Sequence, residues 1–342
     1  MDSGFSLREP RNDVGLLMIS PTLPAELKAA LDGKLQGLSR SDAAQRSQKI
    51  STTYRAGGTS STIKSDADAL AYALARMPAT YAAVAASLNA LTEIAPDLAP
   101  ETLLDVGAGP GTASWAAAEA FPSLQDFTLL DANTTLSRLA LELAHGSSRL
   151  AKCRYLPGDA GGNLAEVSQA DLVIASYIIG ELSEADQRKL TEAMWAKARH
   201  ALVVIEPGTP AGYARILAVR QQLIAAGAFV TAPCPHERPC PLIAPDWCHF
   251  SQRLPRSQAH RQIKGAEVPF EDERFIHVAL TRTPPASRAA RVLAPPDVGK
   301  AEITAKLCTE AGVAPAKVPR RDKVAYAEAR RWRWGDAVMS ES

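Results

Sequence analysis

The stretch Leu103-Leu-Asp-Val-Gly-Ala-Gly-Pro-Gly-Thr112 decides the fold class of this chain. An apolar run that ends in closely spaced glycines is typical of a buried strand turning into a helix. In open α/β sheets, ligands bind at that end of the strand. Glycine lets the backbone approach a ligand closely and adopt positive φ angles. The stretch therefore predicts a ligand crevice at the carboxyl end of a first strand.

Strands and helices alternate on the C-terminal side of this turn. Helices are expected over 113–121 and 136–144, and the apolar runs predict further strands over 126–131, 153–156, 171–177 and 201–207. Such alternation indicates the α/β class, with a parallel sheet wound on both sides by helices. Apolar runs at 275–280 and 289–292 predict returning strands that complete the sheet.

Composition changes divide the chain into four regions. These are an N-terminal helical region (1–95), the core (96–228), a proline- and cysteine-rich insertion (229–262), and C-terminal strands with a basic tail (263–342). In the first region a polar loop is expected at 55–62 and Ser65-Asp-Ala-Asp68 predicts a helix start. Pro78 predicts an interruption of that helix, because proline disfavours helical geometry in the residue before it.

Three details favour S-adenosylmethionine over a dinucleotide as the ligand. Asp105 lies in the strand just before the turn, the glycines follow G-x-G-x-G rather than G-x-G-x-x-G, and the second strand ends in Asp131. The Asp131 carboxylate could accept both ribose hydroxyls, a later carboxylate could accept from the adenine amino group, and the turn after the fourth strand would close the crevice. The predicted cofactor residues are Asp105, Gly107, Gly109, Gly111, Asp131, Asp159, Ser176 and Tyr177.

Together these features resemble the class I methyltransferase fold. The alternatives are a nicotinamide site, or a helix-capping turn surrounded by ordinary aspartates. Methyl transfer also needs an acceptor held in line with the methyl group. The chain contains no Asn-Pro-Pro-Tyr or Asp-Pro-Pro-Tyr tetrad, and Glu181 and Glu206 are ambiguous as orienting groups. No catalytic residue is assigned, although an S-adenosylmethionine-dependent methyltransferase is the favoured enzyme class.

Four cysteines form a second candidate site. Cys234, Cys240 and Cys248 follow the spacing C-x5-C-x7-C, and Cys308 is a distant fourth thiol. Soft thiolates select zinc or an iron–sulfur cluster, and the spacing alone leaves both open. His236 and His249 could each replace a thiolate, and unrelated buried cysteines are the remaining alternative. The fifth cysteine, Cys153, is expected to be a small buried apolar side chain.

The cysteine motif carries a family resemblance. Cys234-Pro-His-x-x-x-Cys-Pro and Trp247-Cys-His-Phe-Ser-Gln resemble the methyltransferase-like family of small ribosomal subunit assembly factors, whose best-known members are mitochondrial. Met77-Pro-Ala-Thr-Tyr, the glycine turn and Tyr326-x-x-Ala-Arg with Trp334-Gly-Asp fit as well, so the resemblance covers about residues 50–336. It implies binding of S-adenosylmethionine and of a [4Fe-4S] cluster ligated by Cys234, Cys240, Cys248 and Cys308.

Charge patterning adds a candidate RNA surface. The formal net charge is +1, which excludes a protein that is basic over its whole surface. Two local segments are rich in arginine and lysine, 253–264 and 317–333, and the second also carries Tyr326, Trp332 and Trp334. Arginine pairs with phosphate and aromatic rings stack on unpaired bases, so small-subunit ribosomal RNA is the expected partner. The alternative is a solvated helix face with its tryptophans packed on the core.

The start of the chain resembles neither a signal peptide nor a transit peptide, and no apolar stretch is long enough to cross a bilayer. A cytoplasmic protein is therefore expected, and in that reducing compartment a cysteine cluster favours metal over disulfides. Two functions follow from the sequence: methylation of small-subunit RNA, or ribosome assembly by a protein that has kept the fold. A zinc-stapled methyltransferase of another substrate is a third.

Overall fold

The computed structural model describes residues 18–35, 40–55, 58–264 and 267–338. The start of the chain and residues 56–57 of the expected polar loop lie outside this range. Within the described residues, four helical segments precede the first strand, and the sequence predicts such a helical region. They are α1 (Ala25–Lys34), α2 (Arg40–Arg55), η1 (Ser60–Thr62) and α3 (Asp66–Ile94).

The core of the molecule is an eight-stranded sheet. Its path runs β3-β2-β1-β4-β5-β8-β6, and β7 also pairs with β8. The first five strands of this path are parallel, whereas β8 runs antiparallel to β5, β6 and β7. The α/β class is confirmed, and the sheet is mixed rather than wholly parallel. Its strands are β1 (Thr102–Val106), β2 (Asp126–Asp131), β3 (Arg154–Pro157), β4 (Ala170–Ser176), β5 (Ala198–Pro207), β6 (Phe229–Ala232), β7 (Phe250–Pro255) and β8 (Phe270–Thr281).

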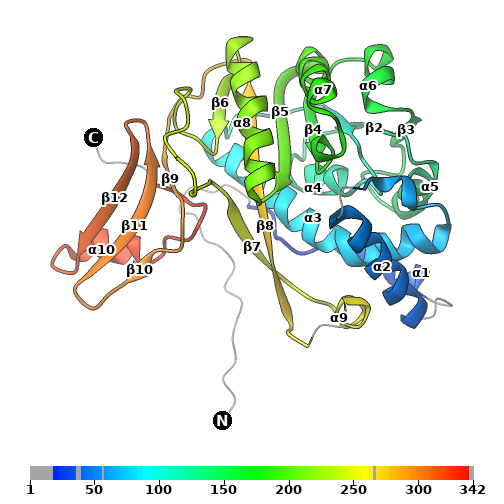
Figure 1. The fold of residues 1–342 in the computed structure, drawn as a ribbon, viewed down its shortest axis with the longest axis horizontal. Coiled ribbons are helices and arrows are strands. Elements are labelled where there is room, and N and C mark those ends of the chain that lie inside the picture. The colour runs from blue at the N-terminus through cyan, green and yellow to red at the C-terminus, as the bar shows by residue number, and fades with distance from the viewer. Residues whose placement is uncertain (1–17, 36–39, 56–57, 265–266, 339–342) are drawn as a thin grey trace.

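Helices cover both faces of this sheet (Figure 1). On one face α3 packs against α4 and α5 and crosses β5 to β8, while on the other face α7 and α8 pack against each other and against β5. The interior strands are apolar and almost wholly buried, as strands covered on both faces must be. The remaining helices of the core are α4 (Thr112–Ala120), α5 (Thr134–Ala144), α6 (Ala160–Asn163), η2 (Leu164–Glu166), η3 (Ile179–Glu181), α7 (Glu184–Lys197), α8 (Pro210–Ala225) and α9 (Gln258–Lys264).

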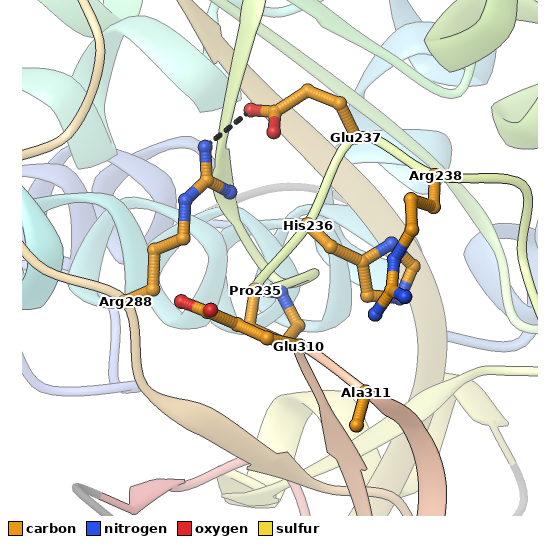
Figure 2. A pocket seen from close by; sticks show the side chains of 7 residues that line it. All are labelled: Pro235, His236, Glu237, Arg238, Arg288, Glu310 and Ala311. Atoms are coloured by element: carbon orange, nitrogen blue, oxygen red, sulfur yellow. Dashed lines mark hydrogen bonds and ion pairs between the residues drawn. The ribbon is translucent and has the colours of Figure 1, made fainter. Parts of the chain in front are cut away.

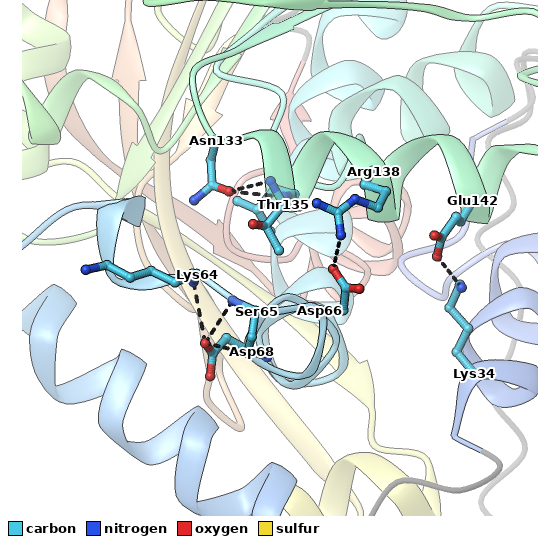
Figure 3. Close-up of polar contacts among 10 residues, drawn as sticks. Lys34, Lys64, Ser65, Asp66, Asp68, Asn133, Thr135, Arg138 and Glu142 are labelled. Carbon is cyan, nitrogen blue, oxygen red and sulfur yellow. Dashed lines mark hydrogen bonds and ion pairs between the residues drawn. The ribbon is translucent and has the colours of Figure 1, made fainter.

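The long helix α3 confirms one prediction and corrects another. Ser65 caps it in a reciprocal capping box with Asp68, as the Ser-Asp-Ala-Asp signal predicts (Figure 3). The expected interruption at Pro78 is wrong, because α3 continues through Pro78 to Ile94. Burial of Met77 and Ala79 on either side of the proline packs this turn against the core. That packing offsets the roughly 3 kcal/mol that a proline costs inside a helix.

The C-terminal strands form a second sheet, which corrects the prediction that they complete the first. Only β8 joins the core, and the later strands follow the order β10-β11-β9-β13, with β12 paired to β11. The edge of the main sheet is already occupied by β6 and β7, so these strands pair with one another around a small apolar cluster of their own. The elements are β9 (Ala290–Val292), β10 (Asp297–Val298), β11 (Glu302–Thr309), β12 (Gly312–Pro319), α10 (Lys323–Ala329) and β13 (Ala337–Val338).

The cysteine-rich insertion begins as β6 and ends as β7 and α9, so the main sheet anchors both of its ends. Its middle, residues 233–249, forms neither helix nor strand. Lys306 of β11 forms an ion pair with Asp246 of this loop, which links the loop to the second sheet. Across the described residues, every helix is too short or too polar to span a membrane.

Candidate functional site

The glycine turn adopts the strained conformation that its sequence predicts. Gly107, Gly109 and Gly111 have φ angles of 69°, 52° and 81°, which favour glycine. Backbone N–H groups of Gly107 and Ala108 donate to the Leu130 carbonyl at 2.8 and 3.1 Å, so the turn is tied to β2. Gly111 is the N-cap of α4. The turn therefore lies at the carboxyl ends of β1 and β2, where the ligand crevice is expected.

Ile178, just after β4, packs closely on Gly107. A Cβ atom at Gly107 would lie 2.2 Å from Ile178 Cδ1, so any other residue would force this side chain to move. Glycine is required here for two reasons, the positive φ and the close approach of Ile178. Ile178 is thus a packing partner of the glycine turn that the sequence does not single out.

Asp105 is fully buried at the end of β1. Its Oδ2 accepts hydrogen bonds from the Ser114 backbone N–H at 3.0 Å and from Ser114 Oγ at 2.8 Å, which anchors the start of α4. Its Oδ1 has no hydrogen-bond partner among the described residues. Burial raises the pKa of Asp105 to about 7, the bonds from Ser114 oppose the rise, and the Asp131 carboxylate adds to it. A buried acceptor without a donor suits a ligand that brings one.

Asp131 lies at the end of β2 and holds the glycine turn. Its two oxygens accept from the backbone N–H groups of Gly109 at 2.9 Å and Asn133 at 2.7 Å, and burial raises its pKa. The Tyr155 hydroxyl donates to the Gly109 carbonyl at 2.7 Å, so Gly109 is held from both sides. Each carboxylate oxygen keeps further acceptor capacity, which ribose hydroxyls could use.

Asn133 connects the crevice to the N-terminal region. Its Oδ1 accepts from the backbone N–H groups at the start of α5 (Figure 3). Its Nδ2 donates to the carbonyls of Ser60 at 2.8 Å and Ile63 at 3.1 Å. Ser60 in turn donates its backbone N–H to Glu181 at 3.3 Å. The η1 segment therefore bridges the chain just after β2 and the chain after β4. The role of Glu181 is this bond to Ser60, at the end of η3.

Two further predicted cofactor residues lie at the same edge. Asp159 follows β3, is exposed, and caps α6 by accepting from the Gly161 N–H at 3.2 Å. The N–H of Gly158 donates to the Asp131 carbonyl at 3.0 Å, which brings the end of β3 beside the end of β2. Ser176 is half-buried at the end of β4. The turn after β1 and the ends of β2 and β3 are thus joined by hydrogen bonds, as the crevice requires.

The Tyr177 side chain makes its polar contacts with β8 and α3. Its φ of 60° is unusual for a residue other than glycine, and its hydroxyl donates to Glu273 Oε1 on β8 at 3.0 Å. Arg76 of α3 donates to the same oxygen at 3.4 Å. Burial and the Glu273 charge raise the pKa of Tyr177. The strained turn that presents Ile178 to Gly107 thus gives the Tyr177 hydroxyl a partner inside the fold.

Both carboxylate oxygens of Glu206, at the end of β5, accept hydrogen bonds from within the protein. Glu206 is 1% exposed, and its Oε2 accepts from Arg215 Nε of α8 at 2.6 Å. Its Oε1 accepts from the Gly180 N–H at 3.4 Å, and burial raises its pKa while Arg215 opposes the rise. Glu206 therefore joins the end of β5 to α8 and η3. This is a structural role for a residue that is ambiguous in the sequence.

Three of the four predicted ligand thiols lie in the loop between β6 and β7, and the fourth lies on β11 of the second sheet. Cys234 and Cys248 are half-buried and pack against the main core, Cys240 is half-buried in the loop between them, and Cys308 is buried on β11. Burial raises the pKa of Cys248, and the other three thiols each raise it further. Burial likewise raises the pKa of Cys308 to about 12, with Cys234 and Cys240 adding to the effect. Cys308, 60 residues beyond Cys248 in the chain, thus comes close enough to the other three thiols to interact with them electrostatically.

Side chains around the thiols distinguish the two histidines. His236 Nε2 lies 3.8 Å from Cys308 Sγ, whereas His249 stacks on Trp247 at 5.2 Å and meets Trp334 edge-on at 4.7 Å. The Tyr213 hydroxyl of α8 donates to Cys240 Sγ at 3.1 Å. No three His, Cys, Asp or Glu side chains of the described ranges are arranged to hold a single metal ion. Neighbouring thiols raise the pKa values of Cys248 and Cys308, but among the described residues the four thiols are not arranged around one ion.

A groove of about 520 Å³ opens between the insertion and the second sheet (Figure 2). It lies between residues 235–238 of the insertion and Glu310 and Ala311 at the turn between β11 and β12. Arg288 closes one side through an ion pair with Glu237 at 2.5 Å. His236 both lines the groove and approaches Cys308, with its Nε2 at 3.8 Å from Cys308 Sγ.

The two basic segments differ sharply. In 253–264, Arg253 pairs with Asp272 at 2.8 Å, and Arg256 and Lys264 pair with Glu271 at 3.3 and 2.5 Å. In 317–333, seven cationic side chains are exposed, and none of the ion pairs among the described residues involves them. They are Lys317, Arg320, Arg321, Lys323, Arg330, Arg331 and Arg333.

Several residues of these sites escape sequence reasoning. Asn133 could have been found, because an asparagine just before a helical run is an N-cap signal. Ile178, Tyr155 and Tyr213 carry no local signal, since only the packing of distant elements brings them to the glycine turn and to Cys240.

The mixed sheet, with a glycine turn and paired carboxylates at the carboxyl ends of its strands, defines a methyltransferase-like α/β protein. A family model described as "Mitochondrial small ribosomal subunit Rsm22" matches residues 66–339. The chain therefore belongs to the Rsm22 family, which confirms the resemblance in the cysteine motif.

Individual relatives match most of the length of this chain. It is 30% identical over 294 residues to the human mitochondrial ribosome assembly protein METTL17, covering 79% of this chain and 62% of that protein. It is 24% identical to Rsm22-cox11 tandem protein 2 of Schizosaccharomyces pombe, over 81% of this chain and 44% of that protein. The chain thus spans less than two thirds of either relative's length.

Likeness to solved structures is weaker. A putative RNA methyltransferase from Pyrococcus horikoshii has a TM-score of 0.39 at 15% identity, covering 58% of this chain and 81% of its own. Magnesium protoporphyrin IX methyltransferase from Synechocystis, solved with SAH, has a TM-score of 0.40 at 10% identity, covering 60% and 84%.

Proposed function

We propose that this protein is an assembly factor of the small ribosomal subunit that binds S-adenosylmethionine and ribosomal RNA. The observation that carries the proposal is its membership of the Rsm22 family, together with seven exposed cations in 317–333 that form no ion pair among the described residues. A relative named for ribosome assembly, human METTL17, supports the same role.

The crevice residues suit S-adenosylmethionine. Asp131 would hold the ribose hydroxyls, and the unpaired Asp105 Oδ1 would receive a hydrogen bond from the ligand. Asp159, Ser176 and Ile178 would line the remaining edge. When bound, the cofactor supplies an electrophilic methyl group. Glu206 and Tyr177, at the rim where an acceptor would lie, are already engaged by Arg215 and Glu273. We therefore favour binding without methyl transfer as the primary role.

We further propose that Cys234, Cys240, Cys248 and Cys308 hold a [4Fe-4S] cluster, with zinc as the alternative. The donor set supports it, because four mutually interacting thiols suit a soft inorganic centre. Free thiols also suit a reducing compartment such as the cytoplasm, where we place the protein. Iron, sulfide and zinc analysis of anaerobically purified protein tests this assignment. Finding one equivalent of zinc and no sulfide would assign the site to zinc. Finding neither iron nor zinc would contradict a metal centre at these cysteines.

RNA contact is assigned to segment 317–333 rather than to both basic segments. The cations of 253–264 are largely neutralised by Asp272 and Glu271, whereas those of 317–333 remain available for phosphates.

The deciding experiment incubates the protein with immature small subunits and S-adenosylmethionine that carries a radiolabelled methyl group. Co-sedimentation without labelled RNA supports the assembly role. Stoichiometric label on RNA would make the protein a methyltransferase instead. Failure to co-sediment, with cofactor binding intact by calorimetry, would contradict any role on the small subunit and favour a different methyl acceptor.

A further inference from the structure

Arg220 of α8 is a buried cation beside the thiols. Its side chain is 4% exposed, and Nη2 donates to the His236 carbonyl and lies 3.4 Å from His236 Nδ1. His236 in turn connects Arg220 to the thiols, because its Nε2 lies 3.8 Å from Cys308 Sγ. Arg220 Nε has no hydrogen-bond partner within the described residues. Arg220 is therefore aimed at the loop that carries Cys234 and is incompletely satisfied there.

Arg220 also lacks a counter-charge. Among the described residues, no carboxylate forms an ion pair with it, while Arg215, one turn and a residue earlier on α8, is paired with Glu206. Arginine stays protonated at every accessible pH. A buried charge without a partner costs several kcal/mol. Something anionic is expected to lie beside Arg220 in the working protein.

Arg291 is a second buried cation near the thiols, next to Cys308. It is 2% exposed on β9 and stands directly across from Cys308 in the antiparallel pair of β9 and β11, so the two side chains share one face. Its nitrogens donate to the carbonyls of Pro233 at 3.3 Å and Gly335 at 2.9 Å, and to Glu93 at 3.3 Å. Arg291 thus has one carboxylate partner, and Arg220 has none.

The thiols themselves do not supply the missing charge while they are unbound. An ordinary cysteine thiol has a pKa of about 8.5 and is mostly neutral near pH 7. Binding to a metal centre deprotonates all four cysteines. Four thiolates then outweigh the positive charge of a zinc ion or of an oxidised cluster core, and the assembled centre is a dianion.

We propose that Arg220 is the electrostatic counter-charge of the inorganic centre held by the four cysteines, with Arg291 as a second on the Cys308 side. The inference rests on the proposed metal centre. It adds Arg220 as a positioning residue on α8, a helix that packs on the main sheet. Arg220 stabilises the loaded state and raises the reduction potential of an iron–sulfur centre, because a nearby cation favours the more negative reduced form.

The test separates the charge of Arg220 from its hydrogen bond. Arg220→Gln keeps a donor for the His236 carbonyl and removes the charge, whereas Arg220→Lys keeps the charge. Arg282→Gln is the matched control, because Arg282 also donates to backbone carbonyls, those of Ala198 and Trp195, without an ion pair among the described residues. The full-length proteins are purified anaerobically, and their folding is checked by circular dichroism.

Two readouts apply. In a redox titration followed by absorbance and electron paramagnetic resonance, Arg220→Gln should shift the midpoint to a more negative potential, while Arg220→Lys and Arg282→Gln stay near wild type. In chelator competition, Arg220→Gln should lose metal about tenfold faster. If the centre is zinc, the rate of metal loss to the chelator alone tests the role of Arg220. A loaded Arg220→Gln protein that matches wild type in both readouts overturns the role of Arg220 alone. A metal-free wild type overturns the proposed centre as well.

Discussion

The half of the molecule built on the main sheet and the half built on the second sheet treat their charges differently. In the main-sheet half, Glu206, Asp171 and Glu271 each pair with a basic side chain within the same half. In the second-sheet half, seven exposed cations of 317–333 have no ion pair among the described residues, and four thiols lie between the halves beside Arg220 and Arg291. These three carboxylates of the main-sheet half are paired internally, whereas the cations of 317–333 are left for outside partners.

This difference suggests a division of labour. Charges that are paired internally contribute to the fold and are poor ligands for phosphate, because binding would have to break an existing pair. Unpaired exposed cations carry no such cost. Four variants test whether the two halves differ as described.

The largest effect is expected at the seam between the halves. Cys308→Ser removes the one ligand thiol that comes from the second sheet, and we expect bound metal to fall at least about tenfold, since a soft centre loses one of four ligands. Metal content per protein measures this. Cys153→Ser is the control, because Cys153 is half-buried beside β3 and outside the group of four thiols. Equal metal content in the two variants would contradict the four-thiol site.

Gly107→Ala should disrupt the main-sheet half alone. The new Cβ meets Ile178 Cδ1 at 2.2 Å and forces alanine to a φ of 69°, so we expect a loss of about 2–4 kcal/mol in unfolding free energy. Urea denaturation measures it. Gly146→Ala, with no atom within 4 Å of its Cβ, should be nearly neutral. Adding Ile178→Ala to Gly107→Ala should recover part of the loss, and no recovery would show that Ile178 is not the obstacle.

Asp105 should give the main-sheet half a measurable pH dependence. Its folded pKa of about 7 lies above the usual value, so the folded state binds a proton that the unfolded state has lost. Its contribution to stability is full below about pH 4 and falls by about 1.4 kcal/mol per pH unit up to about pH 7. Asp105→Asn should remove this slope. Denaturation curves between pH 4.5 and 7 compare the two proteins, and parallel pH profiles would refute the assignment.

The smallest effect concerns RNA. Replacing Arg320 and Arg321 by alanine should weaken binding of a single-stranded RNA several-fold and reduce the salt dependence by about one counterion per residue. Fluorescence anisotropy at several salt concentrations measures both quantities. Arg253→Ala, which removes a cation already paired with Asp272, should change them less. A larger effect at Arg253 would reverse the comparison between the two basic segments.

Local sequence is sufficient wherever neighbours in the chain make the structure. The glycine turn, the carboxylates after β1 and β2 and the capping box of α3 were all predictable, because each needs only a few consecutive residues. Pro78 was misjudged because its local preference is overridden by burial of the residues around it. Tyr177 was assigned to the crevice by its position after β4. Its positive φ and the distant Glu273 give its hydroxyl a different partner.

The amino-acid sequence alone determined the α/β class, the edge at which a ligand would bind and the family, since alternating apolar runs and short motifs encode these locally. Only the tertiary structure decided that the C-terminal strands form a separate sheet and that Cys308, opposite Arg291 in its strand pair, lies 3.8 Å from His236 of the cysteine-rich loop. It also decided which basic segment keeps free charges. The physical reason is that strand pairing and ion pairing join residues far apart in the chain, and local patterns do not specify which distant partners meet.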